Sequence, residues 1–127
     1  IPTVGQEKTK IIPHTVLEDR SSPNRPNEYY LEILITPTDA TKENIVALVK
    51  TIVPTTSKKA VIGIYQDKQA WINAKQNQYG EIFDRGFVAH YTKNINTTND
   101  FKGYNAIKWM QERGQLADLF GTETIIN

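Results

Sequence analysis

The chain has 127 residues, of which 39% are hydrophobic and 23% charged, and its net charge at pH 7 is +1. This length and composition suit one folded domain and exclude intrinsic disorder. The balanced charge excludes the basic stripe of a nucleic-acid-binding protein, and no apolar run is long enough to cross a bilayer, so we expect neither a nucleic-acid partner nor a transmembrane segment.

Residues 1–10 are polar, and we expect them to form a linker before a single α+β domain at 11–127. The chain contains no cysteine, which excludes disulfides, thiolate catalysis and cysteine-based zinc sites. A cysteine-free chain that begins at Ile1 fits an exported protein trimmed after a signal or anchor, although an artificial boundary explains the same start. We therefore expect an extracytoplasmic location.

Two strands open the predicted domain. The stretch at 10–18 is rich in β-branched residues but contains Pro13, which lacks the amide of a central strand, so it predicts an edge strand beginning near His14. Turn-forming residues fill 19–27, and a loop without a helix favours antiparallel pairing with the next strand, at 28–36. In that strand one face carries Tyr29, Leu31, Ile33 and Ile35, and the other carries Tyr30, Glu32 and Leu34.

A helix and a central strand follow. The helical spacing of Ile45, Leu48, Val49 and Ile52 predicts an amphipathic helix. Asp39 or Thr41 can cap its first turn, and Pro54 ends it. The stretch at 59–66 is apolar on both faces, which is typical of a central strand. The segment 28–66 is thus expected to form a right-handed βαβ unit with its strands parallel.

The last third of the chain predicts two helices around one strand. Asp67 can cap a short helix that buries Ala70, Trp71 and Ala74, and 85–93 forms the next strand. A final helix begins near the cap at 99–100, with Phe101, Tyr104, Ile107 and Met110 in helical spacing, is interrupted by Gly114 and ends at Gly121. The order β-β-α-β-α-β-α predicts an α+β two-layer sandwich, with a mixed sheet of about four strands and helices mainly on one face.

The two histidines, His14 and His90, occur in no metal-binding spacing, so no metal or cofactor is expected. Alternation along 85–93 places His90 with Val88 and Thr92. If the helices leave that face open, His90 joins Tyr30, Glu32 and Tyr65 in a polar and aromatic patch, where Glu32 would orient the imidazole and raise its pKa. His90 is then either a general base or a half-exposed strand residue, and the sequence favours the second.

Trp109 has two interpretations. It falls outside the apolar stripe of the predicted final helix, so it is either an exposed interface anchor or packed against the C-terminal residues 122–127. The sequence does not favour either one.

The runs "ATKENIVALVKTIV", "AVIGIYQDKQAW" and "GFVAHYTKN" resemble a pattern of small bacterial domains of unknown function. Such domains are found behind a signal peptide or a lipoprotein anchor. The resemblance covers about residues 28–94 and implies a secreted or membrane-anchored α+β module. It brings no catalytic residues with it.

These observations predict a non-enzymatic bacterial binding module at the cell envelope, with a protein or small-ligand partner. Its binding residues would be Trp109, Tyr30, Tyr65 and His90. One alternative is a small hydrolase that uses His90 as base, with Glu32 and Tyr65 nearby. Another is an immunity or inhibitor protein anchored by Trp109.

Overall fold

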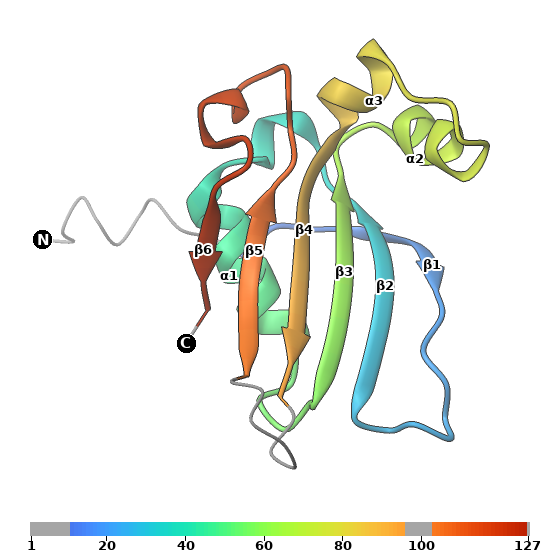
Figure 1. Cartoon of the computed structure of the whole chain (residues 1–127), viewed down its shortest axis with the longest axis vertical. Coiled ribbons are helices and arrows are strands. Elements are labelled where there is room, and N and C mark those ends of the chain that lie inside the picture. Colours follow the sequence, from blue (N-terminus) through green and yellow to red (C-terminus); the bar gives the residue numbers. More distant parts are fainter. Residues whose placement is uncertain (1–10, 96–102, 127) are drawn as a thin grey trace, which may run out of the picture.

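The computed structural model describes residues 11–95 and 103–126, which contain one mixed sheet of six strands (Figure 1). The strands are β1 (Thr15–Asp19), β2 (Glu28–Leu34), β3 (Lys59–Tyr65), β4 (Phe87–Asn94), β5 (Tyr104–Trp109) and β6 (Glu123–Ile125). The α-helices are α1 (Lys42–Ile52), α2 (Lys68–Lys75) and α3 (Glu81–Gly86), with 3-10 turns η2 (Pro37–Asp39) and η3 (Ala117–Leu119). The α+β class with a mixed sheet is confirmed, but the sheet has six strands and not four.

The strands lie in chain order across the sheet, from β1 at one edge to β6 at the other. β2 and β3 pair in parallel, and every other pair is antiparallel. The predictions of an edge strand, an antiparallel first pair and a central third strand are therefore confirmed. Both edges are short or irregular: the β1–β2 register shifts between Val16 and Glu18, and β6 has three residues.

One side of the sheet is packed against α1, which lies behind the strands in Figure 1. Thr41 caps this helix, because its hydroxyl accepts a hydrogen bond from the amide of Asn44 at 3.1 Å. The helix and the strands together form the core, in which these residues are at most 1% exposed: Ile33, Ile45, Leu48, Val49, Ile62, Ile64, Tyr91 and Ile107. We call this side the buried face, and the opposite side, turned toward the viewer in Figure 1, the open face.

The helices α2 and α3 gather at one end of the sheet (Figure 1). Asp67 caps α2 as expected, with its carboxylate accepting a hydrogen bond from the amide of Gln69 at 2.9 Å. A Cβ atom at Gly86 would overlap the Cβ of Ala70, so the two helices depend on glycine for their close approach. The expected layering, with helices mainly on one face of a two-layer sandwich, is not confirmed by this arrangement.

The predicted final helix is wrong. Its described residues form β5 and η3 instead, and β6 follows just after its predicted end, while residues 99–102 and the linker at 1–10 lie outside the described residues. The spacing of Tyr104, Ile107 and Met110 fits a helix, but Ile107 also alternates with solvent-facing Lys108 as in a strand. Pairing with β4 decides between the two, because the outer edge of β4 would otherwise leave its backbone groups unpaired.

Trp109 is 0% exposed, so the interpretation of this residue as an exposed anchor is wrong. As the last residue of β5, it shares the buried face with Ile107. Its indole N–H donates a hydrogen bond to the hydroxyl of Thr124 at 2.9 Å. The other interpretation, packing against the C-terminal residues, is confirmed.

We predict that Trp109→Ala lowers the free energy of unfolding by about 3–5 kcal/mol, because it empties a large buried site and leaves Thr124 without its donor. Urea unfolding followed by circular dichroism measures this loss. Trp71→Ala is the matched control, since Trp71 is half-buried on α2 and its removal should cost clearly less. Equal losses for the two variants would contradict the assigned position of Trp109.

Candidate functional site

Four residues form a lateral row across the open face. In the strand register Glu32 of β2 pairs with Gly63 of β3, Gly63 pairs with His90 of β4, and His90 pairs with Lys108 of β5. Residues that are in register on neighbouring strands project from the same side of a sheet. The structure therefore places Glu32 and His90 on the same face, on either side of a residue without a side chain.

Glu32 occupies the space above Gly63. A Cβ atom at Gly63 would overlap Oε2 of Glu32, so the carboxyl group lies directly on the bare backbone of β3. Oε2 is buried and has no hydrogen-bond partner among the described residues. Burial raises the pKa of Glu32, and the positive charge of Arg20 opposes that rise.

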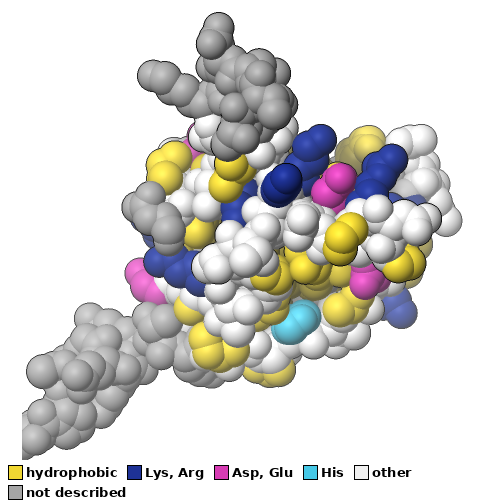
Figure 2. Space-filling view, turned by 90° about the horizontal axis from the view of Figure 1, so that it is seen from below, with side chains coloured by type: hydrophobic (Ala, Val, Ile, Leu, Met, Phe, Trp, Pro, Cys, Tyr) yellow, Lys and Arg dark blue, Asp and Glu magenta, His cyan; other side chains and the backbone are white. Residues whose placement is uncertain are grey.

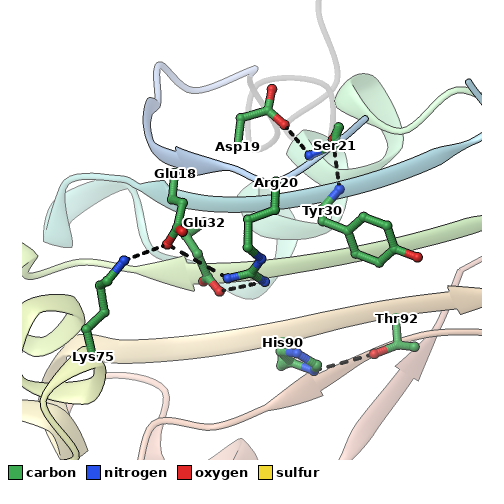
Figure 3. A network of polar contacts seen from close by, with 9 residues as sticks. All are labelled: Glu18, Asp19, Arg20, Ser21, Tyr30, Glu32, Lys75, His90 and Thr92. Carbon is green, nitrogen blue, oxygen red and sulfur yellow. Dashed lines mark hydrogen bonds and ion pairs between the residues drawn. The ribbon is translucent and has the colours of Figure 1, made fainter. Parts of the chain in front are cut away.

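Glu32 is the inner end of a charged network that runs to the β1 edge (Figure 3). Arg20 lies 3.6 Å from Glu32 and 3.8 Å from Glu18, and Lys75 of α2 lies 3.1 Å from Glu18. Lys75 also lies 5.0 Å from the centre of the Trp71 ring. The side chains of Arg20 and Lys75 are each 50% exposed, so these pairs orient Glu32 more than they stabilise the fold.

His90 is half-buried, and its Nδ1 lies 3.4 Å from the hydroxyl oxygen of Thr92. Burial lowers the pKa of His90, and the positive charge of Lys108 lowers it further. The expectation that Glu32 orients the ring and raises its pKa is wrong. As Figure 3 shows, Glu32 is directed toward Arg20, and the His90 ring lies beside Thr92.

A run of neighbouring aromatic rings, of which only Phe87 and Tyr65 are stacked, leads from Tyr79, just before α3, to His90. Ring centres are 4.9 Å apart for Tyr79 and Phe83, 5.4 Å for Phe83 and Phe87, and 4.9 Å for Phe87 and Tyr65. The His90 ring follows, 6.4 Å from Phe87. We call Tyr79, Phe83, Phe87 and Tyr65 the aromatic ladder; it runs from an exposed residue, Tyr79 at 63%, to a buried one, Tyr65 at 6%.

Sequence reasoning missed most of this ladder. Tyr79, Phe83 and Phe87 recur at every fourth residue, a helical spacing that indicates the segment of α3. Tyr65 was included, and it lies on the open face with Gly63, as alternation along β3 requires. Burial and the nearby charge of Glu32 raise the pKa of Tyr65 far above its usual value, so its hydroxyl stays protonated.

The other two sequence candidates lie apart from His90. Tyr30 is on the open face but donates its hydroxyl hydrogen to Glu28 at 2.7 Å, which raises the pKa of Tyr30. Trp109 belongs to the buried face. The structure thus brings Glu32, Tyr65 and His90 to one part of the open face, leaves Tyr30 nearer the start of β2, and removes Trp109 from the set.

Metal and membrane sites find no support in residues 11–95 and 103–126. No group of three or more His, Asp or Glu side chains there is arranged to hold a metal ion. None of the helices in this part of the chain combines the length and the apolar character needed to cross a membrane.

A cavity of about 370 Å³ opens beside His14 and Asp67, away from the row that contains His90.

Comparison with known proteins does not supply a function. No family model, curated protein or solved structure matches this chain.

We predict that Gly63→Ala displaces the Glu32 carboxyl group from the sheet. The pKa of Glu32 should then fall toward its usual value, and the added methyl group should cost about 1–3 kcal/mol of stability. Carboxyl-carbon NMR titration reads the pKa directly. Gly103→Ala is the control, because a Cβ atom there meets its nearest neighbour at an ordinary 3.5 Å. An unchanged Glu32 titration in Gly63→Ala would contradict the burial argument.

The lowered pKa of His90 predicts a pH-dependent stability. Between that pKa and the value of about 6.5 in the unfolded chain, the unfolded state binds more protons, so stability falls as pH drops through this window. His90→Gln should reduce this loss between pH 7 and pH 5, as measured by urea unfolding at a series of pH values. His14→Gln, at the exposed histidine, should leave the profile as in the wild type. The opposite ranking of the two variants would refute the assignment.

Proposed function

We propose that this chain is a binding module whose partner contacts the open face at the aromatic ladder. The observation that carries the proposal is the exposure of Tyr79, at 63%, at the end of a continuous run of neighbouring rings. Aromatic residues dominate the energetic centres of protein interfaces because they bury large areas with few rotatable bonds. Figure 1 shows no described helix over the open face below α2 and α3.

A protein surface is the partner that this face suits best. Small ligands bind mainly in concave pockets, whereas the row of Glu32, Gly63 and His90 crosses the face of a sheet. Charged groups of both signs flank this row, with Glu18 and Lys75 beyond Glu32 and with Lys108 next to His90. The opposite end of the molecule from α2 and α3, seen from below in Figure 2, also carries acidic side chains among Lys and Arg side chains, so mixed charge is not confined to one end. We infer a partner with an apolar centre and a rim of mixed charge.

We also propose that the module works at the bacterial cell envelope, as an exported protein. The absence of cysteine from all 127 residues supports this location, because such a chain is insensitive to the oxidising environment outside the cytoplasm. Fractionation of cells that produce the native gene tests it. Recovery in the cytoplasmic fraction alone would contradict it.

One observation favours a second candidate, a small hydrolase. Glu32 and His90 lie on the same face, both are partly buried, and burial raises the pKa of Glu32 and lowers that of His90; shifted pKa values of this kind are common among the ionisable groups of functional sites. Hydrolysis of simple esters that is lost in both Glu32→Gln and His90→Gln would support this candidate. The alternative of an immunity or inhibitor protein depended on an exposed Trp109, and this residue is buried.

The binding proposal predicts a specific effect of Tyr79→Ala. Partners recovered from an envelope extract would be identified and purified, and their dissociation constants measured with each variant. We expect Tyr79→Ala to weaken binding by about tenfold or more, because it removes the exposed end of the ladder. Phe120→Ala is the matched control, since Phe120 is 45% exposed outside the ladder. Equal affinities for the wild type and Tyr79→Ala would overturn the proposal.

A further inference from the structure

A second site lies on the other side of the sheet, between the C-terminal half of α1 and the buried face. A cavity of about 350 Å³ opens there, next to β4 and β5. Its apolar walls come from five residues, Val49, Val53, Pro54, Ile95 and Ile126. Its polar groups include Lys93, Asn105 and Tyr91. This volume lies within the range of small-molecule sites.

Lys93 is the unusual residue of this cavity, because it is only 5% exposed. Its ammonium group donates hydrogen bonds to the carbonyl oxygen of Thr55 at 3.3 Å and to the hydroxyl oxygen of Ser57 at 3.1 Å. Both acceptors are uncharged. Within residues 11–95 and 103–126, no ion pair includes Lys93. The chain thus buries a cation without a described counter-ion, and burying an unpaired charge is costly.

A structural role in the turn after α1 does not account for the charge. Lys93 does tie Thr55 and Ser57 together, but Ser57 already closes this turn by donating a hydrogen bond to the carbonyl oxygen of Pro54 at 2.7 Å. Two bonds to neutral oxygens use two of the three ammonium hydrogens and leave the positive charge uncompensated. The third hydrogen remains available to a group in the cavity.

The other polar groups of the cavity also favour an anion. Asn105 accepts a hydrogen bond from the Tyr91 hydroxyl through Oδ1, which leaves the NH₂ group of Asn105 as a further donor. Lys50, an exposed residue of α1, adds a second cation to the lining. The residues that line the cavity, all from the described part of the chain, include no Asp or Glu. The cavity therefore combines hydrogen-bond donors and cations with apolar walls.

We propose that this cavity binds a small organic anion with an apolar chain, whose carboxylate or phosphate pairs with Lys93. A medium-chain fatty acid is the simplest ligand of this class. The anion supplies the missing counter-charge, and the chain lies against Val49, Val53 and Ile126. The site lies on the opposite side of the sheet from the aromatic ladder, so it is independent of the proposed function.

Wild-type protein provides the first test. Titration calorimetry with octanoate, octyl phosphate, 1-octanol and octylamine compares one apolar chain with four head groups. We expect the two anions to bind at least tenfold more tightly than octanol, and octylamine not to bind. The stronger of the two anions identifies the head group, and acetate and inorganic phosphate measure the anion alone. Binding of octanol as tight as that of octanoate, or no binding of either anion, would overturn the proposal.

Variants then locate the site. Lys93→Met keeps an unbranched side chain, one heavy atom shorter, and removes its charge, so it should weaken octanoate binding at least tenfold and keep or raise the melting temperature. Lys59→Met is the control, because Lys59 is exposed and does not line the cavity. If Lys93→Met does not fold, Val53→Phe provides the readout, since it fills the cavity without changing its charge. Octanoate binding that survives in the folded variant would refute the site.

NMR of the wild type gives a readout that needs no variant. Octanoate should shift the amide signals of Val49, Val53 and Asn105, which surround the cavity. Shifts centred on Glu32 and His90 would instead place the ligand on the open face and overturn the proposal.

Discussion

The crossover from β2 through α1 to β3 decides which side of this sheet is buried. Parallel strands cannot be joined by a tight turn, so the connecting segment has to cross one face, and here it crosses as a single amphipathic helix. Ile45, Leu48 and Val49 of that helix are almost fully buried against the strands. One helix of 11 residues packs on one face, and no helix of the described residues lies over the opposite face below α2 and α3 (Figure 1). The row at Gly63 and the aromatic ladder both depend on this asymmetry.

Gly63 gives the open face its chemical character. The missing side chain in a central strand lets the carboxyl group of Glu32 lie on the backbone, and burial there raises its pKa. His90, on the next strand, is shifted in the opposite direction by its own burial. The same sheet holds a buried cation on its other side, at Lys93. The sheet thus carries largely buried ionisable groups on both of its faces: Glu32 and His90 on the open face, and Lys93 on the buried face.

The sequence predicts the first four strands, α1 and α2 because their signals are local. Alternation around Ile33 and His90, the caps at Thr41 and Asp67, and Pro54 after α1 each depend on a few neighbouring residues. The same alternation places His90 with Thr92, but it is wrong for Val88 and Phe87: the register shift between Ile64 and Tyr65 puts Val88 in the core and Phe87 beside His90.

The remainder depends on contacts between distant residues, which periodicity does not reveal. The segment around Ile107 fits helical and strand spacing together, and its pairing with β4 decides between them. The same error placed Trp109 outside the core. The orientation of the His90 ring and the direction of its pKa shift depend on Thr92, Lys108 and the depth of burial. Alternation places Lys93 on the apolar face of β4, but only the packed structure shows that the described residues provide it with no acid.

The edges of the sheet restrict how another chain can join it. An exposed strand edge invites a further strand, which extends the sheet by backbone hydrogen bonds. Here β6 offers three residues, and the register of β1 is shifted beside the charged Glu18. Neither edge is a long, regular template. The two edges therefore disfavour the joining of several copies into one continuous sheet. A partner that binds the face of the sheet adds no strand, so the sheet keeps its six strands in such a complex.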